Sequence, residues 1–200
     1  MIIQERASPL AGGVKYIIMN NTQKLFRDFD LAFIDTETTG RGFNHELIEM
    51  AVVRVSGFNF SVLEEWEAKI KPQHLELADP ESLQVSHYND KDWVNALDEE
   101  TVLKTFLQKT EKTILVGHNL TFDWFYIHKA LGAYNLQPTF WYKSLDIFSL
   151  AWQKLRNNPS IRYLSLGELA TYFGITREKP HTALDDARIA YKVFLKLIEL

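Results

Sequence analysis

The chain has 200 residues, enough for one domain with a single substantial core, and its composition is that of an ordinary globular protein. It has no cysteine, which excludes disulfides, thiolate zinc sites and thiol catalysis, so any metal would need carboxylate, histidine or carbonyl ligands, a set that favours Mg or Mn. Its 22 basic and 26 acidic residues give a net charge of −4, which argues against a protein that coats long nucleic acid by charge alone.

Residues 1–29 are weakly patterned and are predicted to form an N-terminal extension to a domain at 30–200. Their apolar residues are too interrupted for a secretory signal, and no apolar run in the chain approaches the roughly 18–20 residues of a membrane span. We therefore expect a cytoplasmic protein that makes no contact with a membrane.

The first half of this domain is predicted to be a small sheet. A short apolar run indicates a strand at 31–34, and the segments 47–55 and 59–70 are typical of a second and a third strand. The connections between them are short, which favours an antiparallel meander.

Helices and strands alternate in the second half. The pattern predicts a helix at 99–110, a strand at 112–118, a helix at 121–134, a short strand leading into a helix within 140–152, a helix at 165–175 and a last helix from 183. Ser165 is the expected N-cap of its helix. Together the elements predict an α/β fold, in which helices flank a central mixed sheet of five strands, three antiparallel and then parallel.

Two carboxylates stand at the end of the first strand, in "FIDTETTG". Strand side chains alternate, so Asp35 and Glu37 share a face with Leu31 and Phe33, and they lie roughly 6.6 Å apart along the strand. Like charges at the end of an apolar strand repel one another unless a cation lies between them. Taken alone, such a pair is more often a solvated strand end followed by a turn.

A third carboxylate, Asp123, heads a helical stripe formed by Tyr126, Ile127, Ala130 and Leu131. We expect this stripe to face the sheet, and a carboxylate on it needs a partner because an unpaired buried charge is costly. The alternative is that Asp123 only stabilises the positive end of the helix dipole.

The stretch "HTALDDA" opens the last helix with a histidine and two adjacent aspartates. Asp186 continues into a wholly apolar stripe and is predicted to point inward, whereas Asp185 continues into a largely solvated one. The spacing Thr182-x-x-Asp185 also resembles a capping box, so Asp185 is expected only to cap the helix. His181 precedes the cap, and histidine is the only side-chain type whose unperturbed pKa lies close to working pH. The apolar stripe after Asp186 consists of Ala190, Val193 and Leu197. The stripe after Asp185 consists of Ile189, Lys192 and Lys196.

Four inward carboxylates on three elements of one small domain need a common explanation, and a divalent-metal site supplies one. In sequence and order the segments "FIDTETTG", "VGHNLTFDWFYI" and "HTALDDA" resemble the three motifs of the DEDDh (DnaQ-like) 3′–5′ exonucleases, and "ELIEMAVV" resembles their second strand. The resemblance covers about residues 30–200 and implies an RNase H-like fold. It also implies hydrolysis of the 3′-terminal phosphodiester of single-stranded DNA or RNA, with release of nucleoside 5′-monophosphates.

The resemblance assigns roles to the residues of the three motifs. Asp35, Glu37 and Asp186 would hold one of two divalent cations, Mg or Mn, and Asp35 would bridge to the second. Asp123 would reach that second cation through water, and His181 would be the general base.

The resemblance also implies substrate contacts. The backbone of Thr38, Thr39 and Gly40 would hold the terminal sugar and the 3′ hydroxyl, and Phe43 would stack on the last base, unless it is only an exposed loop residue. His118 and Asn119 are further expected contacts, and Asn119 would also fix the loop before its helix. Arg177 and Lys179 would either touch phosphate or belong to a solvated loop.

One departure from the family pattern is visible. His87, in "LQVSHYNDKDW", stands where many relatives have the glycine of a V-x-G-I turn near the substrate. The substrate preference of the family therefore carries over to this chain less safely than its chemistry does. The choice between DNA and RNA stays open.

Two other interpretations fit less well. A D-x-E pattern and an Asp-Asp pair also occur in haloacid-dehalogenase phosphatases, but here the pair opens a helix, and Asp123 and His181 would have no role. A nucleic-acid-binding module with a dead site is disfavoured because every ionisable residue that the chemistry needs is present. A proofreading subunit bound to a DNA polymerase stays open beside a stand-alone nuclease.

Overall fold

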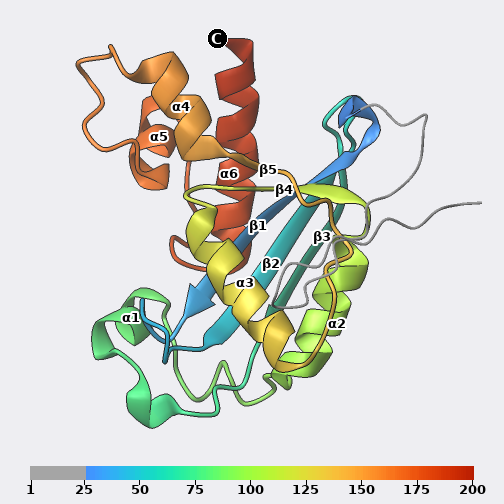
Figure 1. Ribbon diagram of the computed structural model, residues 1–200. Coiled ribbons are helices and arrows are strands. Elements are labelled where there is room, and N and C mark those ends of the chain that lie inside the picture. The colour runs from blue at the N-terminus through green and yellow to red at the C-terminus, as the bar shows by residue number, and fades with distance from the viewer. Residues whose placement is uncertain (1–25) are drawn as a thin grey trace, which may run out of the picture.

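Five strands form one mixed sheet in the order β3-β2-β1-β4-β5 (Figure 1). The computed structural model describes residues 26–200. Strand β1 pairs antiparallel with β2, and β2 with β3, whereas β4 and β5 are added in parallel on the other side of β1. This confirms the predicted sheet. The strands are β1 (Asp30–Thr38), β2 (Leu47–Val55), β3 (Val62–Lys69), β4 (Thr113–Gly117) and β5 (Ser144–Asp146).

The helices are α1 (Pro80–Val85), α2 (Glu99–Lys109), α3 (Thr121–Ala133), α4 (Ile147–Leu155), α5 (Leu166–Tyr172) and α6 (Ala183–Glu199), with short 3-10 helices at Phe26–Asp28 and Leu75–Leu77. Ser165 caps α5 as predicted, because its hydroxyl accepts a hydrogen bond from the Glu168 N–H. Helix α1 was not predicted. It is too short to show an apolar period, although Asp79 before Pro80 is a typical helix start.

The predicted N-terminal extension, residues 1–29, lies for the most part outside the described residues, and the domain boundary at residue 30 stays a prediction. Within residues 26–200, no helix is both long enough and apolar enough to cross a membrane.

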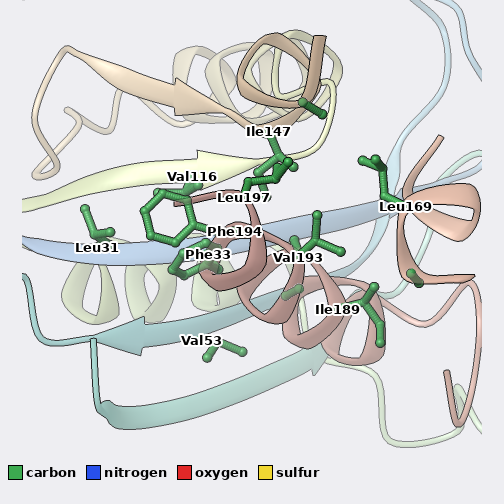
Figure 2. Packing of buried hydrophobic residues seen from close by; sticks show 14 of the residues in the cluster. Leu31, Phe33, Val53, Val116, Ile147, Leu169, Ile189, Val193, Phe194 and Leu197 are labelled. Carbon is green, nitrogen blue, oxygen red and sulfur yellow. The ribbon is translucent and has the colours of Figure 1, made fainter. Parts of the chain in front are cut away.

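Alternating residues of β1 belong to two separate hydrophobic clusters. Leu31 and Phe33 pack with residues of α4, α5 and α6, whereas Ala32 and Ile34 pack with residues of α2 and α3. Figure 2 shows the first cluster, in which the Phe33 ring meets the Phe194 ring of α6 edge-on at 5.3 Å between centroids. The strand therefore carries one helical layer on each face, and its side chains continue to alternate to its end.

Helix α6 buries the stripe that was predicted for Asp186. Ala190, Val193 and Leu197 are each at most 2% exposed, and full burial of one such aliphatic side chain contributes about 1.5–3 kcal/mol. This packing fixes the rotation of α6 about its axis, and so it fixes where the first turn of the helix points its side chains.

Candidate active site

Asp35 and Glu37 lie within β1 rather than after it, because the strand extends to Thr38 instead of ending at residue 34. The extension is held by pairing with β2, in which Glu37 lies opposite Glu49. The pairing register shifts between Glu37 and Thr38, an irregularity that often lies beside functional sites. By the alternation of β1, both carboxylates continue the face that α6 covers.

Asp123 reaches the same strand from the other face of the sheet. The Thr36 hydroxyl donates a hydrogen bond of 2.7 Å to Asp123 Oδ1, and Asp123 is only 4% exposed. The buried residues of α3 are those of the predicted stripe, namely Asp123, Tyr126, Ile127, Ala130 and Leu131. The site therefore includes both faces of β1, with Asp35 and Glu37 on one face and Asp123, held by Thr36, on the other.

Asp186 completes the group from the first turn of α6. One of its oxygens accepts a hydrogen bond from the Arg177 guanidinium, and the other lies 4.0 Å from His181 Nδ1. Among residues 26–200, ligand atoms of Glu37, His181 and Asp186 lie within 4.8 Å of one another. The structure thus brings His181 as close to the carboxylates as a metal ligand would be.

Arg177 lies in the loop before α6 and is not merely solvated, since its side chain is 18% exposed. Gly167 at the start of α5 leaves room for it, because a Cβ at that position would come within 3.0 Å of Arg177 Nη1. An internal cation therefore offsets part of the negative charge of Asp186.

The predicted capping role of Asp185 is wrong in part. Thr182 makes no side-chain cap hydrogen bond, and its hydroxyl donates instead to the Lys179 carbonyl at 3.0 Å. Asp185 is 7% exposed rather than solvated, and its Oδ2 has no hydrogen-bond partner among the described residues. The reason is that α6 also packs against β3, where Arg188 pairs with Glu65, so this side of the helix is partly covered instead of open to solvent.

The carboxylates raise one another's pKa. Burial and then the charges of Asp123, Glu37 and Asp186 raise the pKa of Asp35 well above its usual range. Burial, followed by the charge of Asp186, raises the pKa of Glu37 to about 8, and Arg177 partly opposes this rise. Burial raises the pKa of Asp123 to about 7, against the hydrogen bond from Thr36. Such mutual repulsion in a buried cluster disappears when a cation binds between the charges.

This repulsion predicts an unusual pH dependence of stability in the presence of a chelator. A carboxyl whose pKa is higher in the folded than in the unfolded state penalises folding once it ionises. For Glu37 the penalty is absent below the ordinary value of 4.5, grows as the pH rises and is complete above about 8. We expect its contribution to lower the free energy of unfolding by up to about 1.4 kcal/mol per pH unit in that window, as measured by urea denaturation at pH 5 to 8.

Two variants separate this effect from titration elsewhere in the chain. Glu37→Gln removes the ionisation and is expected to flatten the fall in stability. Glu111→Gln, which removes an exposed carboxylate paired with Lys112, is expected to leave the slope unchanged. Equal slopes for the wild type and Glu37→Gln would show that Glu37 is not under repulsion.

Glu49 is a buried carboxylate of the site that the sequence analysis did not single out. It is 2% exposed, lies opposite Glu37, and has one oxygen 3.6 Å from Lys69 Nζ and another without a partner among the described residues. Burial raises its pKa, whereas Lys69 and the backbone of Ala183 oppose the rise. A single acid inside a nine-residue apolar strand was the signal that could have identified it.

A cavity of about 320 Å³ opens beside the carboxylates. One wall is the end of β1, another is α1, and His181 faces in from the loop before α6. Arg41 and Phe122 also line it, a cation and an aromatic ring that the sequence analysis did not assign. The lining residues are Thr36, Glu37, Thr38, Arg41, Asp79, Glu81, Ser82, Val85, Phe122 and His181.

The turn after β1, predicted to hold the substrate sugar, is fixed by hydrogen bonds. The Thr38 hydroxyl donates to the Gly40 carbonyl at 2.7 Å, and the Tyr126 hydroxyl donates to the same oxygen at 2.6 Å. Glycine is required at residue 40, since a Cβ there would lie 2.4 Å from the His45 ring. Thr39 accepts from the Glu46 N–H at 2.9 Å. The turn is therefore rigid, and its contact with substrate stays a prediction.

The remaining predicted substrate residues differ in their surroundings. Phe43 is 78% exposed with its ring edge-on to Phe125, which suits a stacking surface. His118 Nε2 donates to the Leu164 carbonyl at 2.7 Å and ties two loops together. Asn119 has a φ of 59°, a left-handed conformation that asparagine tolerates, in the loop before α3. None of these contacts tests a role in binding substrate.

Comparisons with known proteins agree with this geometry. The exonuclease family model (RNase_T) matches residues 32–194. The PolC-type DNA polymerase III of Thermotoga maritima is 29% identical over 197 residues, which cover 96% of this chain and 14% of that polymerase. The epsilon subunit of DNA polymerase III of Aquifex aeolicus is 29% identical over 174 residues, covering 86% of this chain and 82% of the subunit.

A solved structure shows the same fold. The nuclease domain of 3′hExo, described as a DEDDh family member bound to rAMP, superposes with a TM-score of 0.70 at 16% identity, over 85% of this chain and 92% of that domain. The predicted RNase H-like fold is thereby confirmed. With the family match over most of its length and the three motifs gathered around β1, the chain belongs to the exonuclease family.

Proposed function

We propose that this chain is a metal-dependent 3′–5′ exonuclease that hydrolyses the terminal phosphodiester of single-stranded DNA or RNA and releases nucleoside 5′-monophosphates. The observation that carries the proposal is the gathering of Asp35, Glu37, Asp123 and Asp186 from three elements beside a cavity that His181 lines. Glu37, Asp79 and Glu81 line this cavity, so a phosphate bound there would need cations to neutralise its charge in addition to the lining Arg41.

The donor set fits hard divalent cations. Carboxylate oxygens are the ligands that Mg and Mn prefer. Burial raises the pKa values of Asp35, Glu37 and Asp123, and for Asp35 and Glu37 the neighbouring carboxylates add to the rise, which a bound cation would offset. Asp35, Glu37, Asp123 and Asp186 would hold the cations. When bound, the cations supply positive charge that activates a water molecule and stabilises the leaving oxygen.

The side chains of the chain supply the remaining steps. His181 accepts a proton from the attacking water at Nδ1, the ring nitrogen that faces Asp186. A new bond forms between the water oxygen and phosphorus, and the bond from phosphorus to the 3′ oxygen of the preceding nucleotide breaks. That oxygen takes up a proton from solvent, which leaves a 3′ hydroxyl on the shortened strand. Arg41 and Phe122 line the cavity and are placed to contact a terminal nucleotide by charge and by stacking.

The function is tested by metal dependence and by polarity. The purified chain is expected to shorten 5′-labelled single strands from the 3′ end with Mg or Mn and to be inactive in excess EDTA. A 3′-phosphate should slow hydrolysis strongly, whereas a 5′-block should not, because the proposed site binds a free 3′ terminus. Matched DNA and RNA oligonucleotides in the same assay establish the preferred sugar.

Two outcomes would contradict the proposal. Full activity in EDTA would exclude the metal mechanism, and efficient cutting of a closed circular single strand would indicate an endonuclease. The melting temperature gives a readout that needs no substrate, since Mg or Mn should raise it by binding only the folded state.

A second candidate function is a proofreading module bound to a DNA polymerase. It is favoured by the PolC-type and epsilon relatives, which are polymerase proteins by their descriptions. Copurification of a polymerase at equal stoichiometry with the tagged chain would support this function. Full activity of the isolated chain on free 3′ ends, with no polymerase retained, would support a stand-alone nuclease.

A further inference from the structure

A side-chain hydrogen bond joins the loop 173–182, which carries His181, to the segment that follows α1. His87 Nε2 donates a hydrogen bond of 3.0 Å to the Pro180 carbonyl, one residue before His181. His87 lies two residues after the end of α1, so the bond joins segments 93 residues apart in sequence. Other hydrogen bonds of the loop lead to α5, from the Ile175 N–H to the Ala170 carbonyl, or to α6, from Arg177 to Asp186.

The position of this bond relates it to the site. Ser82 and Val85 of α1 line the cavity on one side, and His181 lines it on the other. The bond from His87 to Pro180 therefore joins the segment after α1 to the segment that carries His181. Because His181 follows Pro180 directly, the bond restrains the backbone from which the imidazole of His181 projects.

The backbone at both ends of this contact is unusual. His87 has a φ of 56° and His181 a φ of 64°, in the left-handed region that residues with a side chain rarely adopt. Such conformations persist only where surrounding contacts hold them, and they are frequent at functional sites. Around His87 these contacts include the Asn89 side chain, which donates to the His87 carbonyl at 3.0 Å. A glycine would adopt the same φ without strain, but it would provide no imidazole.

We propose that His87 is a positioning residue, whose imidazole latches the loop 173–182 to α1 and so holds His181 over the acid cluster. The inference rests on the proposed function, in which His181 is the general base. The hydrogen bond from the His87 imidazole to Pro180 is a favourable contact that offsets the strain of the His87 backbone. It also accounts for a histidine at a position where the backbone favours glycine.

The test compares four substitutions. His87→Ala keeps the strained φ and removes the donor, and His87→Gln keeps the strain and restores an N–H donor of similar reach. Lys112→Gly is the control for placing glycine at an equivalent backbone, since Lys112 also has a φ of 56° and its exposed side chain contacts only Glu111 among the ion pairs of residues 26–200. It is compared with His87→Gly, which relieves strain and removes the latch together.

Two readouts are needed. Hydrogen exchange of the peptide covering 174–184 is expected to become about 2- to 10-fold faster in His87→Ala, the effect of losing one hydrogen bond, with partial recovery in His87→Gln. The kcat on a single-stranded oligonucleotide should fall by a similar factor at unchanged KM. The reason is that losing the His87–Pro180 hydrogen bond changes the position of His181 and not the binding of substrate. His87→Gly should share both effects, and Lys112→Gly should show neither.

The outcomes distinguish the latch from the proposed function. Unchanged exchange in His87→Ala would overturn the latch whatever the activity. Faster exchange with unchanged kcat would overturn the positioning role. A wild-type chain without nuclease activity would overturn the proposed function, and with it the catalytic purpose of the latch, even where the exchange confirms the contact.

Discussion

Asp186→Asn is expected to abolish measurable turnover while changing the free energy of unfolding by no more than about 1 kcal/mol in chelator. The carboxylate is placed by the apolar stripe of α6 beside Glu37, and asparagine keeps its shape but loses the charge that a cation requires. Two electrostatic effects on stability oppose each other. The substitution removes repulsion with Asp35 and Glu37, but it also weakens the contact with Arg177. The measurements are kcat on a single-stranded oligonucleotide and urea denaturation.

The neighbouring Asp185 provides the matched control. Asp185→Asn makes the same chemical change one residue earlier, about 100° around the helix, on the side of Arg188 rather than of Glu37. It is expected to retain most activity and to cost at most about 1 kcal/mol, because the lost charge is favoured by the helix dipole while its buried Oδ2 has no partner. If Asp185→Asn had no measurable kcat while Asp186→Asn kept its kcat, the assignment of the two aspartates would be wrong.

His181→Ala is expected to lower kcat by about 10²–10⁴, the usual contribution of a general base, while Mn binding is retained. The physical reason is that His181 faces the carboxylates from a loop and is 51% exposed, so it can take a proton from water without being required to hold the cation. Titration calorimetry with Mn measures binding, and the pH profile of kcat should lose the limb that an ionisable base produces.

The geometry also defines the result that would contradict this role. His181 lies within ligand distance of Glu37 and Asp186, so a loss of Mn affinity comparable to that of Asp186→Asn would identify His181 as a metal ligand instead. His74→Ala is the control, since His74 is exposed and pairs only with Glu76 among the salt bridges of residues 26–200. It should affect neither affinity nor rate.

The sequence by itself determined which side chains share a face. The period of two along a strand placed Asp35 and Glu37 with Leu31 and Phe33, and the structure has the last two in one cluster under α6. The helical period placed Asp123 and Asp186 on buried stripes in the same way. These predictions depend only on local geometry, which is the same in every strand and helix.

Only the tertiary structure decided which distant residues meet. Glu49 enters the site because the register of β2 places it opposite Glu37, and no local period encodes a register. Asp185 is buried because α6 lies over β3, a contact that a helical wheel does not contain. The bond from Thr36 to Asp123 joins two residues that are 87 positions apart in the sequence. The bond from His87 to Pro180 joins two that are 93 positions apart. Their partners are set by how the strands pair and the helices pack, since the free energy of those contacts comes from burial across the whole domain rather than from the residues' own neighbours in the chain.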